Sequence, residues 1–206
     1  MNLTKLKQAE QHFLSRYPLG FRDPEMLVLA KRHKMDSLID FAQQEFARAR
    51  FKNPDAVVEA MTKLVSRSSM VSMFEKPKFR DYVRGLSGKG KSKLADGLRQ
   101  FLHGDQEQGF ESTVETLASA RLAKWSLVTI LPNYYAPDDE VFIKPTTAKG
   151  VIEQFELDGL TYSATPTWDF YRRYRASILA MRKKVARSLA PNNAAFCGFL
   201  MMSLDG

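Results

Sequence analysis

The sequence predicts a mainly α-helical protein with a small β element around residues 125–145. Three observations carry this expectation: helical spacing of apolar residues over 3–14, an N-cap followed by proline at both 23–24 and 53–54, and a long amphipathic stretch over 168–189. The chain has 206 residues, of which 44% are hydrophobic, so it can bury one sizeable core.

The N-terminal half is predicted to be helical throughout. The first helix is expected to stop at the turn residues Pro18 and Gly20, and the next two to start at the N-caps Asp23 and Asn53. Three further helices are expected in order: a short one over 74–86 interrupted near Pro77, one capped by Ser92 that ends at 103–104, and one over 106–123.

The pattern changes at Trp125. Residues 126–131 are β-branched and stop at Pro132, and residues 140–144 follow a turn-rich segment. This predicts two short strands, with a third near 161–162. We expect a helix over 147–155 after them.

A long basic helix is predicted over 168–189. At about 100° per residue, aromatic and aliphatic side chains share one stripe and Lys and Arg side chains lie opposite. Residues 191–202 form a closing helix with almost no charge, which we expect to be buried or to lie in an interface.

The predicted organisation is a helical lobe over 1–124 and an α+β lobe over 125–206, packed together as one globular unit. The chain has neither a membrane-length apolar run nor a signal-like N-terminus, which predicts a cytoplasmic protein. Cys197 is the single cysteine, so no intramolecular disulfide can form, and its apolar neighbours indicate a small buried side chain.

The net charge of +8 is distributed unevenly. Residues 71–99 hold 8 basic against 3 acidic side chains and residues 165–190 hold 7 against 1, whereas residues 100–164 hold 4 against 10. Two interpretations follow: either the two basic blocks meet in the fold and form a surface for nucleic-acid phosphates or another polyanion, or the acidic segment between them partly neutralises them. The predicted contacts are Lys89, Lys91, Lys93, Arg172, Arg173, Lys183, Lys184 and Arg187.

Residues 85–92 match the phosphate-cradling pattern G-x-x-x-x-G-K-S in every defined position. A functional loop of this kind follows a buried parallel strand, yet residues 78–84 carry too many charges for one. We interpret the segment as a basic loop before a helix, able to contact a backbone phosphate.

No other motif predicts chemistry. Asp138, Asp139 and Glu140 with Lys144 resemble a nuclease metal site only loosely, because their spacing is typical of a solvated turn. The three histidines stand far apart without metal-ligand spacing. No metal, cofactor or catalytic residue is predicted.

Three stretches together resemble an uncharacterised family of bacterial cytosolic proteins of about this size: residues 13–24, residues 124–125 with 129–132, and residues 142–146. The resemblance covers most of the chain. It implies a bacterial cytosolic protein and carries no known activity, cofactor or catalytic residue. In that family the segment corresponding to residues 85–92 is not a glycine-lysine loop, which further weakens the nucleotide interpretation.

Three hypotheses follow from the sequence. The first is a non-enzymatic protein that binds nucleic acid through backbone phosphates, without reading base sequence. The second is a helical adaptor or subunit that docks a protein partner, or a second copy of itself, through residues 194–202. The third is a nucleotide hydrolase that uses Lys91 and Ser92.

Overall fold

A computed structural model describes residues 1–204, which form eleven α-helices and three 3-10 helices without a strand. The mainly α prediction is therefore confirmed. The α-helices are α1 (Leu3–Arg16), α2 (Pro24–His33), α3 (Met35–Glu45), α4 (Pro54–Arg67), α5 (Glu75–Gly85), α6 (Gly88–His103), α7 (Gln106–Ala118), α8 (Trp125–Tyr135), α9 (Pro145–Gln154), α10 (Trp168–Arg182) and α11 (Asn193–Met202). The 3-10 helices are η1 (Gly20–Arg22), η2 (Arg48–Lys52) and η3 (Arg187–Leu189).

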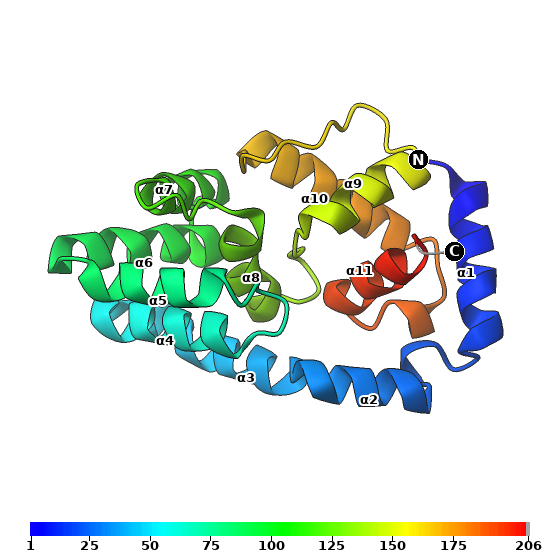
Figure 1. Cartoon of the computed structure of the whole chain (residues 1–206), viewed down its shortest axis with the longest axis horizontal. Coiled ribbons are helices and arrows are strands. Elements are labelled where there is room, and N and C mark those ends of the chain that lie inside the picture. The colour runs from blue at the N-terminus through cyan, green and yellow to red at the C-terminus, as the bar shows by residue number, and fades with distance from the viewer. Residues whose placement is uncertain (205–206) are drawn as a thin grey trace.

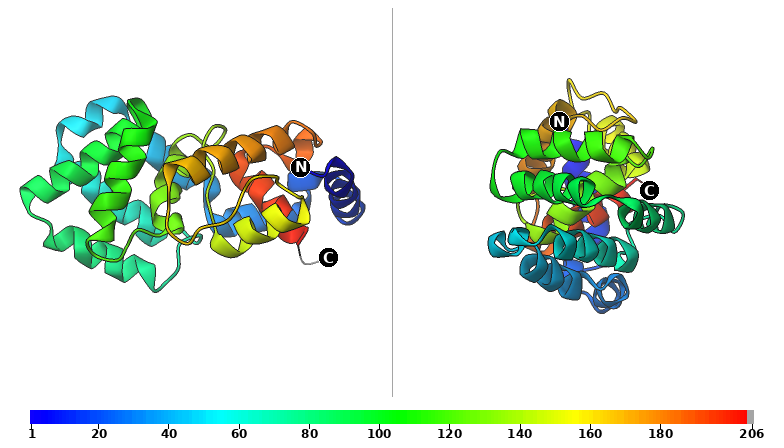
Figure 2. Two further views of the ribbon diagram at one scale, coloured as in Figure 1. Left: turned by 90° about the horizontal axis from the view of Figure 1, so that it is seen from above. Right: turned by 90° about the vertical axis from the view of Figure 1, so that its left-hand side faces the viewer.

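The molecule is elongated, with one group of helices toward each end (Figure 1). Helices α3 to α8 form the group on the left, and α1, α2 and α9 to α11 form the group on the right. Figure 2 shows the same separation from above. Helix α8 contacts α3, α4, α6 and α7, so it lies inside the left group.

Helices α6 and α7 pack most closely in the left group, and two glycines allow this. A methyl group on Gly109 would lie 2.6 Å from the Cα of Phe101, and one on Gly97 would lie 2.9 Å from Oγ1 of Thr113. Both distances are below 3.0 Å, closer than a Cβ atom approaches a non-bonded neighbour. The close-packed interior leaves no room for the neighbour to move away. The two backbones can approach this closely only where Cβ is missing.

Helix α1 packs against the C-terminal part of the chain. The Asn2 N–H donates to the carbonyl of Phe155 at 2.7 Å, and the Ala186 N–H donates to the buried carboxylate of Glu10 at 2.6 Å. The ring of Phe13 meets that of Phe199 edge to face at 5.4 Å. The predicted boundary at residue 124 therefore does not divide the molecule, because α1 lies with α9 to α11.

The β element predicted around 125–145 is wrong. Residues 125–135 form α8, and neither 140–144 nor 161–162 is a strand. Nearly every residue of α8 is buried, so its all-round apolar composition reflects a helix enclosed by four others. Periodicity cannot distinguish such a helix from a buried strand, and here packing overrides β-propensity.

The long basic helix predicted over 168–189 is also wrong in length and in character. Helix α10 ends at Arg182, a turn follows, and Arg187 belongs to the separate η3. The apolar stripe itself is present: Phe170, Tyr174 and Ile178 are buried. The cations of α10, however, are largely paired with acids, as described below.

Several helix boundaries differ from the predictions for local reasons. Lys34 adopts a left-handed conformation (φ 54°) and separates α2 from α3. Pro77 does not interrupt α5, because it lies in the first turn, where its missing N–H has no intrahelical acceptor. The cap of α6 is Ser87 rather than Ser92, and α7 ends at Ala118 rather than at 123.

A buried polar network around Glu140 joins α7, α10 and α11. The Glu140 side chain is 5% exposed and accepts hydrogen bonds from Arg175 at 2.6 Å, from Gln106 at 2.9 Å and from the Tyr171 hydroxyl at 2.5 Å. Its backbone carbonyl accepts from Asn193 at 2.9 Å. Burial first, and the Glu140 carboxylate second, raise the pKa of Tyr171 well above its ordinary value, so the phenol remains a donor.

Among the described residues, no helix is both long enough and apolar enough to cross a membrane.

Candidate nucleic-acid interface

The lysines predicted at the start of α6 are only partly available to a ligand. Lys91 donates to Asp55 at 2.7 Å and Lys93 donates to Glu115 at 2.8 Å. Lys89 is exposed and forms no ion pair with an acid of residues 1–204. An exposed ion pair is weak, so a phosphate can displace these acids, but the acids reduce the local positive potential.

The G-x-x-x-x-G-K-S segment forms the junction between α5 and α6, not a strand followed by a loop. The Ser87 hydroxyl accepts from the Gly90 N–H at 3.2 Å and so caps α6. This bond uses a backbone donor that a phosphate cradle would need. The preceding residues belong to helix α5, so the setting of a nucleotide-binding loop is missing.

The cations predicted on the second basic block divide into two groups. Arg172 and Arg173 both pair with Asp169, at 3.1 and 3.4 Å, and Arg173 also donates to the carbonyl of Gly159. The exposed remainder comprises Lys183, Lys184 and Arg187, which follow α10 and form no ion pair with an acid of the described chain.

The structure does not bring the two predicted basic blocks together. The start of α6 lies at the left end of Figure 1, whereas the C-terminal end of α10 lies in the right half, against α11. The view from above shows the same separation. The two blocks therefore do not form one joint surface.

A different cluster, which the sequence did not single out, lies where α5 and α8 begin. Met73 and Phe74 precede α5 and are each 76% exposed. The Ser126 hydroxyl of α8 donates to Glu75 of α5 at 2.7 Å, and this bond holds the two helix starts side by side. We call Met73, Phe74, Lys76 and Lys124 the Phe74 cluster. Each lies within two positions of Glu75 or Ser126 in the sequence.

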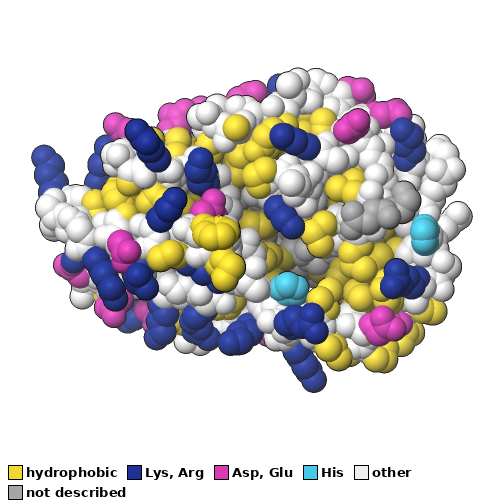
Figure 3. All heavy atoms as spheres, in the orientation of Figure 1, with side chains coloured by type: hydrophobic (Ala, Val, Ile, Leu, Met, Phe, Trp, Pro, Cys, Tyr) yellow, Lys and Arg dark blue, Asp and Glu magenta, His cyan; other side chains and the backbone are white. Residues whose placement is uncertain are grey.

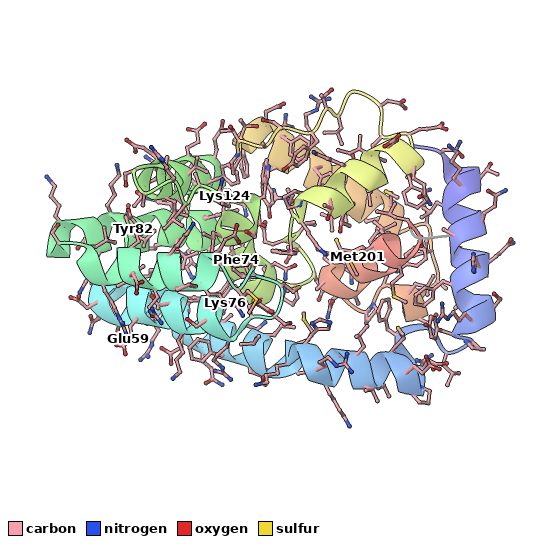
Figure 4. The ribbon with its side chains drawn as sticks, viewed as in Figure 1. Glu59, Phe74, Lys76, Tyr82, Lys124 and Met201 are labelled. Atoms are coloured by element: carbon pink, nitrogen blue, oxygen red, sulfur yellow. The ribbon has the colours of Figure 1, made fainter. Side chains whose placement is uncertain are left out.

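The Phe74 cluster is cationic around an aromatic centre. Figure 4 shows Phe74 between Lys124 and Lys76 on one face of the molecule. Neither lysine forms an ion pair with an Asp or Glu of residues 1–204. Space-filling Figure 3 shows further Lys and Arg side chains over α4, α5 and α6 on the same face. An aromatic ring this exposed contributes little to the core, so it is available for contact.

The sequence showed the positive charge around this cluster but not the exposure of its aromatic residue. Residues 71–99 were identified as a basic block, and Phe74 was assigned to the start of a helix. Lys124 lies beside Phe74 because Glu75 and Ser126, 51 residues apart, meet in the fold. A contact between residues so far apart cannot be predicted from the local sequence pattern.

A half-open groove of about 360 Å³ lies between α1 and the end of α11. Its lining combines Phe13, Tyr17 and Met202 with the polar side chains of Lys5, Gln8, His12, Arg16, Gln154 and Ser203. Lys5 is paired with Glu156 at 2.8 Å. Among the residues 1–204 that line the groove, none has an acidic side chain to serve as a general base or metal ligand.

The residues considered for metal chemistry do not converge. Glu140 is buried in its ion pair with Arg175, and Asp138 pairs with Arg182 at 2.7 Å. Within residues 1–204 no group of three or more His, Cys, Asp or Glu side chains is placed to hold a metal ion.

The apolar segment predicted to dock a partner is mostly used inside the fold. Phe196, Phe199 and Leu200 of α11 are fully buried, and Met201, at 39% exposure, is the large apolar side chain of α11 that faces solvent. Helix α11 contacts α9, α10 and η3. This packing leaves little of α11 for a partner protein.

Cys197 of α11 is expected to react slowly with thiol reagents in the folded protein. Burial raises the pKa of its thiol to about 12, so at pH 8 only about one molecule in 10,000 carries the reactive thiolate. Labelling with a chromogenic disulfide should be more than about 100-fold slower without urea than in denaturing urea. Equal rates would show that the thiol is accessible and its pKa ordinary.

Comparison of the chain with protein-family models, with curated proteins and with solved structures gave no match. The resemblance to a bacterial family therefore stays a prediction.

Proposed function

We propose that this protein binds single-stranded nucleic acid through backbone phosphates, without catalysing a reaction on it. The observation that carries the proposal is the Phe74 cluster: an aromatic ring 76% exposed between two lysines that form no ion pair within the described residues, beside the Glu75 carboxylate that is hydrogen-bonded to Ser126. Single strands are bound in this way, because any base can stack on an aromatic face while cations hold the phosphates.

The surrounding charge favours a polyanion over a neutral partner. Lys78 and Arg84 of α5 add cations to the same helix, and α4 contributes Lys63 and Arg67, whose charged ends lie 5.4 Å from the ring of Phe41. A surface of this kind attracts polyanions over a Debye length, and the attraction weakens as salt increases. The cations contact the sugar-phosphate backbone and any base can stack on Phe74, so no base preference is expected.

The proposal is tested by fluorescence anisotropy of a labelled oligothymidylate at several salt concentrations. We expect Phe74→Ala to weaken binding by roughly 5- to 100-fold, the range that loss of one stacked base gives. Charge reversal of both Lys76 and Lys124 should weaken binding further and make the dependence on salt shallower by roughly one unit per lost contact.

The matched control is charge reversal of Lys183 and Lys184, which are exposed and form no ion pair within residues 1–204; they follow α10, whose end lies in the other half of the molecule. We expect this variant to bind within about twofold of the wild type, since it carries the same change of net charge without touching the cluster. If the control bound more weakly than the Lys76 and Lys124 variant, the nucleic-acid interface would lie at the end of α10 and not at the Phe74 cluster. If neither these substitutions nor the salt concentration changed the affinity for the oligonucleotide, the proposal would be wrong.

A further inference from the structure

Helix α2 presents an apolar outer face that no part of residues 1–204 covers. Leu27 is 47% exposed and Val28 is 61% exposed, while Met26 on the opposite side is 4% exposed. Leu19, just before η1, is 55% exposed. Figure 3 shows hydrophobic side chains along the lower right edge of the molecule, where Figure 1 places α2.

The charges around this face are segregated along the helix. Glu25 lies in the first turn of α2, and Lys31 and Arg32 lie in the last. Glu25 and Arg32 are seven residues apart, so they stand two turns apart on nearly the same side of the helix, beside Val28. All three charged side chains are exposed and take no part in an ion pair within residues 1–204.

We propose that this face binds the same face of a second copy of the chain, with the two α2 helices antiparallel. A twofold axis near Val28 brings the Glu25 of each copy opposite the Arg32 of the other, and the two Val28 side chains meet near the axis between the two ion pairs. Leu27, about 100° further around the helix, lies at the edge of the contact away from the ion pairs. The surface is thus complementary to itself, which an isologous contact requires. A parallel arrangement would instead place like charges together.

The length of α2 sets the strength of this contact. Standard stable interfaces bury roughly 1,600 Å² of surface in total. A contact between two ten-residue helices, with Leu19 beside each, buries a smaller area than this. The dimer is therefore expected to form reversibly and to depend on protein concentration. It uses a surface distinct from the Phe74 cluster, so each copy keeps its cluster whether or not the pair forms.

The test is sedimentation equilibrium of the full chain at increasing concentration up to about 1 mM, the range in which weak pairs associate. We expect the wild type to pass from monomer to dimer, and Val28→Glu to raise the dissociation constant by at least about tenfold. Met73→Glu, at an even more exposed apolar residue outside α2, should leave the constant unchanged. Circular dichroism verifies that each variant is folded.

Charge exchange decides between self-pairing and any other contact. E25R and R32E should each weaken the dimer by about tenfold, because each places like charges opposite one another. The double variant E25R/R32E should restore it, because the two charges are then complementary again in reversed order. A wild type that stays monomeric throughout, a dimer lost in Met73→Glu instead, or a double variant as weak as the single ones would overturn the proposal.

Discussion

Replacing Glu140 with alanine is expected to destabilise the protein by about 3 to 5 kcal/mol, enough to remove much of the stability of an ordinary domain. The substitution leaves the guanidinium of Arg175, whose side chain is 16% exposed, without its acid, and leaves the hydroxyl of the buried Tyr171 without its acceptor. Removing one partner of a buried pair is costly because the remaining charge cannot recover its lost hydration.

Urea unfolding followed by circular dichroism measures this effect. Glu140→Gln should fall between alanine and the wild type, since an amide oxygen still accepts from Tyr171 but no longer neutralises Arg175. Glu115→Ala is the control: its partner Lys93 is half exposed, and exposed pairs contribute less than about 1 kcal/mol. Equal losses for Glu140→Ala and Glu115→Ala would show that the network contributes nothing beyond a surface pair.

The second large effect is expected from Gly109→Ala, which should destabilise the protein by about 3 kcal/mol or more. The added methyl group would overlap the backbone of residues 100 and 101 on α6, with 2.7 Å to the carbonyl carbon of Gln100. A backbone cannot turn aside as a flexible side chain does, so α6 and α7 have to move apart. Such a shift also opens space next to Phe101 and Phe110, whose rings meet at 5.8 Å.

The same change at Gly88 provides the control. A methyl group there meets nothing within 4 Å. Because alanine favours helix more than glycine does, Gly88→Ala should be neutral or stabilise by up to about 1 kcal/mol. If thermal melting gave similar midpoints for the two variants, α6 and α7 would not be held as closely as described.

The sequence predicted best those features that depend on neighbouring residues. The starts of α2 and α4 were placed correctly, because Asp23 and Asn53 cap them with their own side chains and proline follows at once. Helix α8 was mistaken for a strand, because its character depends on the four helices around it. Burial on all sides erases the periodicity that distinguishes the two.

The buried polar network and the surface features were harder to predict. Glu140 was assigned to a solvated turn, yet its partners Gln106 and Arg175 lie 34 and 35 residues away in the chain. The basic blocks were correctly recognised as charge excess, but their mutual position and their acid partners depend on the tertiary fold. Phe74 gave no local sign of being exposed, because the same residue type more often fills a core.

Helix α1 finds its partners among residues 155–199, and this affects how the protein is made. Glu10 and Ala186 are 176 residues apart, so α1 cannot complete this docking until residue 186 has been translated. Until then its apolar stripe stays uncovered. The nascent chain should therefore need protection, by a chaperone or by rapid translation, for longer than a protein whose first helix pairs with its second.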